Sequence, residues 1–168
     1  TKMKCLDNDV VVKLDVKDYL MTGTSTELVT LNREWLQTED VSSAALDVLT
    51  DCIDFLLESQ FVLCRDGTLH KVVKGSGMGL IMSGSVADGA LLSIERKFVR
   101  SSTLLEYGIR LFARFKDDIF ILGSDSARTL RFCHSFIKAA APFRIEIETI
   151  SNTCCPFLEV DVCLQHVE

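Results

Sequence analysis

Three aspartates stand where strand-like segments end or break. Asp15 lies near the end of the β-branched run at 10–16 (VVVKLDV), and Asp117 and Asp118 interrupt the apolar run at 114–122 (RFKDDIFIL). Adjacent carboxylates repel each other and resist burial, so a cation or a solvated turn has to offset that cost. Clustered carboxylates favour Mg²⁺ or Mn²⁺, which prefer oxygen ligands. Two such ions about 3.5–4 Å apart would clamp an in-line phosphoryl displacement.

The acid pair leaves two interpretations open. A hairpin beside the 10–16 strand would bring Asp117 and Asp118 to Asp15, whereas a free hairpin tip would leave them as solvated surface charges. Because neighbouring strand residues point to opposite faces, we expect Asp117 to be the closer partner of Asp15 and Asp118 to be auxiliary.

Hydrophobic periodicity predicts the elements that would position these acids. The predicted strands are 10–16, 107–115, 119–123, 143–150 and 156–164, with a further hairpin at 61–73 that turns at Asp66–Gly67. The predicted helices are 25–35 (capped by Thr24 or Ser25), 41–60, 83–98 and 126–141 (capped by Ser124 or Ser126). Strands joined by tight turns indicate an α+β fold, an antiparallel sheet with helices packed on one face.

A glycine-rich segment, KGSGMG at 74–79, precedes the predicted helix at 83–98. It lacks the lysine and serine of a phosphate-binding P-loop, so a plain turn is one interpretation. Gly84 and Gly89 would each weaken the helix by about 1 kcal/mol relative to alanine. Their presence predicts that another element packs very close to the helix backbone.

Composition is that of an ordinary globular chain. The 168 residues are 48% hydrophobic and 25% charged, which suits one domain with a sizeable core. A net charge of -6 argues against a strongly basic nucleic-acid binder. No apolar stretch is long enough to span a bilayer, so we expect no membrane partner. Seven cysteines without metal-finger spacing predict reduced core residues in a reducing compartment, nucleus or cytoplasm.

Four segments together resemble the palm motifs of reverse transcriptases, most closely the Penelope-like group, which is related to telomerase catalytic subunits. The segments are KLDVKDYLMTG, GSGMGLIMSGSVADGALLSIE, RFKDDIF and PFLEVDV, in that order. The family pattern is an aspartate strand followed by an aromatic residue, a GxxMGxxxSxxxA helix, RYxDD and FLD. The matching residues of the second motif are Gly75, Met78, Gly79, Ser83 and Ala87. Each motif alone is weakly specific, but four in register over nearly the whole chain are specific.

The resemblance implies a polymerase palm that performs RNA-directed DNA synthesis with two Mg²⁺ or Mn²⁺ ions. It implies that Asp15, Asp117 and Asp118 are catalytic and that these three and Val16 hold the metal ions. It implies an RNA template, a DNA primer and deoxynucleoside triphosphates as partners. A catalytically silent palm that serves as a scaffold, or an RNA-templated RNA polymerase, are the alternatives.

The same resemblance assigns residues to substrates. The nucleotide-binding residues would be Val16, Lys17, Asp18, Tyr19 and Leu20, with Tyr19 or Leu20 as the gate against a ribose 2′-hydroxyl. The template and primer residues would be Gly75, Met78, Gly79, Ser83, Phe157 and Leu158, the last two in the primer grip. This chain departs from the family at Gly84, Lys116 and Glu159, where proline, a small or apolar residue and aspartate are usual.

The expected domain organisation is a single palm over 1–168 that includes part of the fingers at about 24–74. The remaining fingers and the thumb of the family would belong to the parent protein outside these residues. We therefore expect the acidic chain alone to bind nucleic acid weakly.

Overall fold

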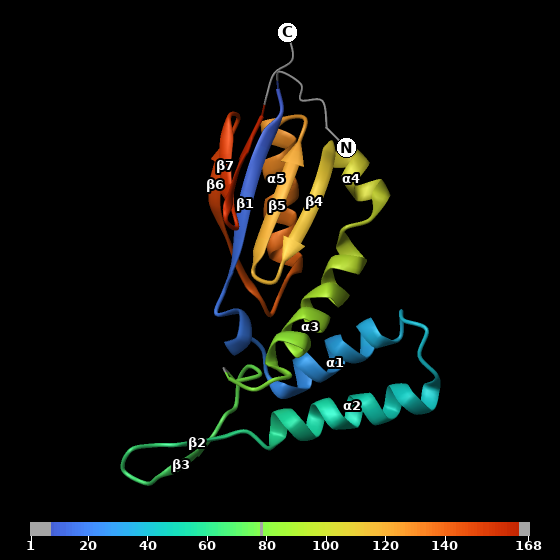
Figure 1. Ribbon diagram of the computed structural model, residues 1–168. Coiled ribbons are helices and arrows are strands. Elements are labelled where there is room, and N and C mark those ends of the chain that lie inside the picture. The colour runs from blue at the N-terminus through green and yellow to red at the C-terminus, as the bar shows by residue number, and fades with distance from the viewer. Residues whose placement is uncertain (1–7, 78, 165–168) are drawn as a thin grey trace. The chain divides into compact units, whose positions relative to one another are not determined.

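The computed structural model describes residues 8–77 and 79–164 (Figure 1). The chain divides into two compact units. The first unit contains the chain up to Lys17 and again from Phe98 onward, and the second unit is Asp18–Lys97. The segment at about 24–74, which we expected to be part of the fingers, falls within the second unit.

The first unit is built on a four-stranded antiparallel sheet with strand order β4-β5-β1-β6. These strands are β1 (Val10–Lys17), β4 (Ile109–Phe115), β5 (Asp118–Gly123) and β6 (Arg144–Ser151). β1 lies between β5 and β6, and Val11, Val12 and Leu14 are completely buried. A β-branched segment with both faces covered favours such an inner position. The predicted α+β fold with an antiparallel sheet is confirmed.

One face of the sheet is covered by helix α5 (Ser126–Ala139), which Figure 1 shows behind β5. Phe132 and Phe136 of α5 contact Phe112 of β4, with ring centroids 6.2 and 5.5 Å away. Phe112 pairs with Ile121, and Ile121 pairs with Val12. Directly paired residues of antiparallel strands share a face. Val12 and every second residue from it along β1 therefore face α5, and the Asp15 side chain points to the opposite face of the sheet.

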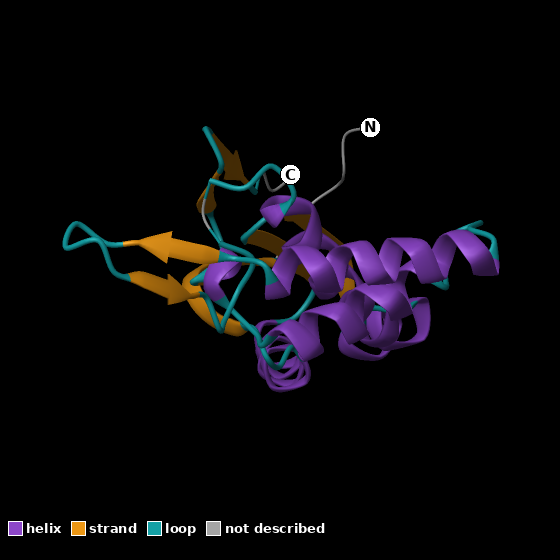
Figure 2. Cartoon of the chain, turned by 90° about the horizontal axis from the view of Figure 1, so that it is seen from below, coloured by secondary structure: helices purple, strands orange, loops and turns teal. Residues whose placement is uncertain are grey.

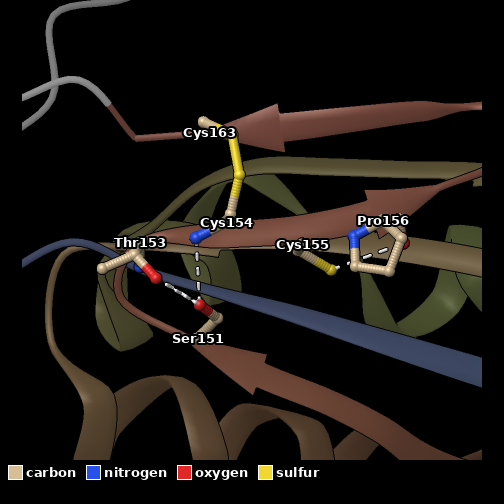
Figure 3. The surroundings of a disulfide bond; sticks show 6 residues. All are labelled: Ser151, Thr153, Cys154, Cys155, Pro156 and Cys163. Atoms are coloured by element: carbon tan, nitrogen blue, oxygen red, sulfur yellow. Dashed lines mark hydrogen bonds between the residues drawn. A yellow bond between two sulfur atoms is a disulfide. The ribbon is translucent and has the colours of Figure 1, made fainter.

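A short hairpin covers part of the other face. It consists of β7 (Cys154–Phe157) and β8 (Val160–Cys163), and Cys155 packs in a buried cluster with Val11 and Phe120. We predicted one strand at 156–164, which is wrong, because Leu158 adopts a positive φ of 56° and reverses the chain. Figure 3 shows the open end of this hairpin, where Cys154 and Cys163 form a disulfide. The expectation that the cysteines are reduced core residues is therefore corrected for this exposed pair, which is oxidised, and for Cys52 and Cys64, which are free but exposed.

Two further local expectations need correction. The cap of α5 is Asp125, whose side chain accepts the N–H of Arg128, instead of Ser124 or Ser126. Helix α4 (Ser101–Tyr107) was not predicted; it ends at Gly108, which has a φ of 68°.

The second unit is mostly helical (Figure 2). Its elements are a 3-10 turn η1 (Tyr19–Met21), α1 (Ser25–Leu36), α2 (Ser43–Glu58), β2 (Phe61–Leu63), β3 (Leu69–Lys71) and α3 (Ser83–Phe98, whose last residue belongs to the first unit). Thr24 caps α1 in a full capping box with Glu27. β2 and β3 form the predicted hairpin, which projects from the end of α2 (Figures 1 and 2).

Another element packs very close to α3 at Gly89, as predicted, and that element is helix α1. A Cβ atom at Gly89 would lie 2.3 Å from Asn32 Oδ1 and 2.6 Å from a ring carbon of Trp35. Asn32 is buried, and its amide donates to the carbonyl of Val86 on α3 at 2.9 Å. A Cβ atom at Gly84 would have no neighbouring atom within 4 Å, so the prediction of close packing at Gly84 is wrong.

None of the helices in the described part of the chain is both long and apolar enough to cross a membrane.

Candidate active site

The β4–β5 hairpin lies beside β1 and brings the acid pair to Asp15. Asp118 is the direct register partner of Asp15, and the N–H of Val16 donates to the carbonyl of Asp117 at 2.9 Å. Directly opposed residues share a face, so Asp15 and Asp118 point to the same side of the sheet. Our expectation that Asp117 would be the closer partner differs from this register. The reason is that Asp117 belongs to the turn, and strand alternation begins only at Asp118.

The turn itself has two residues, Lys116 and Asp117, between the paired residues Phe115 and Asp118. Lys116 has a φ of 54°, a conformation that glycine adopts more easily than a residue with a side chain. Arg114 donates a hydrogen bond to the carbonyl of Lys116 at 2.9 Å. A non-glycine residue at positive φ beside two carboxylates is the kind of backbone strain that clusters at functional sites.

Two lysines of β1 form ion pairs with these acids. Lys13 and Lys17 lie two residues before and after Asp15, so all three side chains share its face. The Lys13 ammonium lies 2.9 Å from Asp118 Oδ1, and the Lys17 ammonium lies 2.5 Å from Asp15 Oδ2. All four groups are half-buried, with side-chain exposures between 18% and 36%.

The lysines respond electrostatically to this environment. The hydrogen bonds that Lys13 donates to Glu148 and Asp118 raise the pKa of Lys13 above its ordinary value, against a smaller opposing effect of burial. The hydrogen bond to Asp15 likewise raises the pKa of Lys17. Both side chains are therefore cations throughout the physiological pH range.

The donor set is chemically suited to a hard divalent cation. Asp15 and Asp118 offer carboxylate oxygens on one face, which is the chemistry that Mg²⁺ and Mn²⁺ prefer. Across 8–77 and 79–164, no three His, Cys, Asp or Glu side chains converge as a metal group. The lysine ammonium groups are the cations that the two carboxylates contact in this arrangement.

The β7–β8 hairpin brings Phe157, a predicted primer-grip residue, to the acid face, which is the side of the sheet that carries Asp15 and Asp118. Phe157 contacts Phe120 of β5, with ring centroids 5.3 Å apart. Phe120 is two residues from Asp118 on the same strand and therefore shares its face. Leu158 lies at the turn of the hairpin and is half exposed. The structure thus places Phe157 on the same side of the sheet as Asp15 and Asp118.

The predicted nucleotide-binding residues are divided between the two units. Val16 and Lys17 end β1, and the Val16 N–H is already bonded to Asp117, which leaves its carbonyl as the group for the predicted metal contact. Asp18 has a φ of 51° and begins the η1 turn. Tyr19 is buried, and its hydroxyl donates to Asp88 at 2.5 Å. Leu20 is partly exposed.

The glycine-rich loop is fastened to the η1 turn within the second unit. The N–H of Ser76 donates to the Leu20 carbonyl at 2.8 Å. A Cβ atom at Gly75, whose φ is 76°, would lie 2.4 Å from that carbonyl oxygen. Gly75 is therefore required for the close approach of two backbone segments.

Ser83 begins α3 as predicted and fixes the other end of the loop. It is 3% exposed, and its hydroxyl donates to the carbonyls of Ser76 and Gly77. This places Ser83 as a support for the loop. Gly79 has a φ of 91° and open space around its Cβ position. Met78 lies outside the described residues.

Sequence reasoning missed several residues that contact the predicted site residues. Lys13 is one of them, and strand alternation around Asp15 is a signal that would have found it. Lys17 was predicted as a nucleotide-binding residue, but its ion pair with Asp15 was not. Glu148, which contacts Lys13 at 2.8 Å, was missed because the β-bulge that sets it beside Thr149, opposite Lys13, is not visible in the sequence pattern. Asp88, the partner of Tyr19, lies 69 residues away and carries no local signal.

Comparison with known proteins identifies a similar structure. Neither a family model nor a curated protein sequence matches the chain. Two solved structures of apo telomerase from Candida tropicalis match it over 95% of its length. The TM-scores are 0.62 for the form truncated of its C-terminal domain and 0.64 for the other, at 17% and 16% identity. The chain spans about a third of those telomerases, 34% and 32% respectively. It therefore shares an α+β fold with this part of telomerase.

Proposed function

We propose that this chain is the palm of a reverse transcriptase, which adds deoxynucleotides to the 3′-hydroxyl of a primer on an RNA template. The observation that carries the proposal is the register of β1 and β5, which sets Asp15 opposite Asp118 and bonds Val16 to Asp117. The comparison supports it: 95% of this chain matches about a third of a telomerase, which is a reverse transcriptase.

We assign each predicted site residue named below a part in nucleotide transfer. Asp15, Asp117, Asp118 and the Val16 carbonyl would hold two Mg²⁺ or Mn²⁺ ions, which would supply charge neutralisation at the reacting phosphate. Phe157 and Leu158 would hold the primer strand. Gly75, Gly79 and Ser83 would shape the loop that supports the template, and the partly exposed Leu20 is favoured as the sugar gate over the buried, hydrogen-bonded Tyr19.

A primer-extension assay tests this function. The assay uses a DNA primer on an RNA template, the four deoxynucleotides and Mg²⁺, with the longest natural polypeptide that carries these residues. We expect Asp15→Asn and Asp117→Asn to reduce extension to background. Asp161→Asn is the matched control, since Asp161 is an exposed acid on β8. Full extension by the Asp117→Asn variant would refute the assignment.

A second candidate is a catalytically silent palm that acts as a nucleic-acid-binding or structural scaffold. The ion pairs of Asp15 and Asp118 with lysines favour it, because an ammonium partner already neutralises each carboxylate without a metal ion. Extension by the unmodified protein that depends on Mg²⁺ would reject this candidate. An RNA polymerase would be distinguished by extension with ribonucleotides in place of deoxynucleotides.

A further inference from the structure

A β-bulge in β6 lies beside the acid face. Lys13 pairs with Thr149, whereas the next residue, Leu14, pairs with Ile147. Glu148 is therefore the extra residue of β6 and has no partner in the register. Bulges next to active sites commonly turn a side chain in a direction that regular alternation would not allow.

The bulge brings the Glu148 carboxylate to both lysines. Its Oε2 atom lies 2.8 Å from Lys13 Nζ, and its Oε1 atom lies 4.0 Å from Lys17 Nζ. Each lysine thus has two acidic partners, one aspartate and the shared glutamate. Glu148 is 40% exposed and needs no rearrangement of the core to move with them.

We propose that Lys13 and Lys17 are the resident counter-ions of Asp118 and Asp15, and that Glu148 receives both lysines when a divalent cation binds the aspartates. The inference rests on the proposed function, since it concerns the same carboxylates. It makes Glu148 a positioning residue: its carboxylate determines how readily the lysines leave the acids.

The charges explain why such a receiver is needed. A lysine that loses its aspartate to a metal ion would otherwise be a half-buried ammonium facing a divalent cation a few ångströms away, which is strongly repulsive. Glu148 offers that ammonium a second carboxylate, which Lys13 already contacts at 2.8 Å and Lys17 approaches to 4.0 Å. Glu146, on the same strand, already forms an ion pair with Arg144 and contacts neither lysine as an ion-pair partner in the described residues.

Mn²⁺ binding measured by isothermal titration calorimetry on this chain tests the proposal without any activity. The variants are Lys13→Met/Lys17→Met, Glu148→Gln and the combination of all three substitutions. Lys17→Met alone is the second variant if the double substitution impairs folding. Lys138→Met controls for net charge, because Lys138 is exposed on α5.

We expect removal of the two lysines to tighten Mn²⁺ binding by about tenfold or more, while Lys138→Met changes it by less than about twofold. We expect Glu148→Gln to weaken binding by about tenfold in the native background. In the lysine-free background we expect Glu148→Gln to have little effect, because no lysine remains to be received. Such non-additivity is what a shared interaction predicts.

Three results would overturn the inference. One is an equal effect of Glu148→Gln with and without the lysines, which would make Glu148 a simple source of negative potential. Another is unchanged binding in the lysine double variant, which leaves the proposed function intact if Asp15→Asn still abolishes binding. The third, no binding in any variant, removes the metal site of the proposed function as well.

Discussion

Single side-chain positions decide how closely the elements of this protein approach one another. Gly75 and Gly89 both lie where a side chain would not fit. A Cβ atom would be 2.4 Å from the nearest neighbouring atom at Gly75 and 2.3 Å from it at Gly89. We predicted such packing for Gly89 because a glycine lowers the stability of a helix and so needs a compensating contact. The same argument failed for Gly84. Helix propensity reports only the cost of a glycine, whereas its benefit depends on a neighbour that is distant in sequence.

Gly89→Ala should therefore destabilise the protein, whereas Gly84→Ala should not. The new methyl group would displace Asn32 or Trp35, which costs about 1–3 kcal/mol in an overpacked interface. Gly84 lies on the same helix with open space around it, so alanine there should leave stability unchanged or raise it slightly. Urea denaturation of the two variants measures the difference. Equal stability of both would contradict the close approach of α1 to α3.

Thiol chemistry should separate the cysteines by their surroundings. Burial raises the pKa of the Cys133 thiol to about 12 and also raises that of Cys155, so neither forms much of the reactive thiolate near neutral pH. Cys52 and Cys64 are exposed and free. In a Cys5→Ser variant at pH 8, we expect a disulfide reagent to modify Cys52 and Cys64 rapidly.

Cys133 and Cys155 should react only after denaturant is added, and Cys154 and Cys163 only after reduction. Mass spectrometry of the modified peptides assigns each site. Rapid native modification of Cys133 would show that the core of the first unit opens easily.

At the scale of elements, the sequence predicted the sheet strands and most helices, and errors collected at their ends. β7 and β8 were read as one strand because their turn, at Leu158–Glu159, contains no glycine, proline or asparagine. Leu158 nevertheless has a φ of 56°, held by strand pairs on either side. The register that places Asp118 opposite Asp15 likewise depended on the length of the Lys116–Asp117 turn, which strand periodicity does not specify. The local sequence pattern does not predict the geometry of a turn when the pairing of the flanking strands determines it.

The start of α5 offers a direct test of a helix boundary. Asp125 accepts the N–H of Arg128 at 2.8 Å, so Asp125→Ala should lower stability by about 0.5–2 kcal/mol. Ser126→Ala is the matched control, since Ser126 is exposed and is the first helical residue instead of the cap. Thermal unfolding of the two variants measures the effect. A larger loss at Ser126 would place the cap where the sequence pattern suggested.

At the scale of the molecule, the chain is similar in fold to about a third of the matched telomerases, and its net charge affects what it can bind. The net charge is -6, and the lysines of the acid face are already paired with carboxylates. The α+β class followed from the sequence because it depends on short-range patterns. The meeting of Asp15 with the acid pair joins segments that are distant in the sequence, so the residue pattern left it open and the family resemblance implied it. The division into two units did not, because contacts between distant segments define it.

An acidic chain whose lysines on the acid face are engaged in ion pairs should bind nucleic acid weakly and with steep salt dependence. Phosphate contacts release counterions, so affinity falls as a power of the salt concentration that grows with the number of contacts. We expect a dissociation constant weaker than about 1 μM for an RNA–DNA primer-template near 150 mM salt, and a loss of about tenfold or more between 50 and 200 mM. Fluorescence anisotropy with a labelled primer measures both. Sub-micromolar binding at physiological salt would mean that this part of the fold carries its own duplex-holding surface, and the proposed dependence on further basic segments would then be wrong.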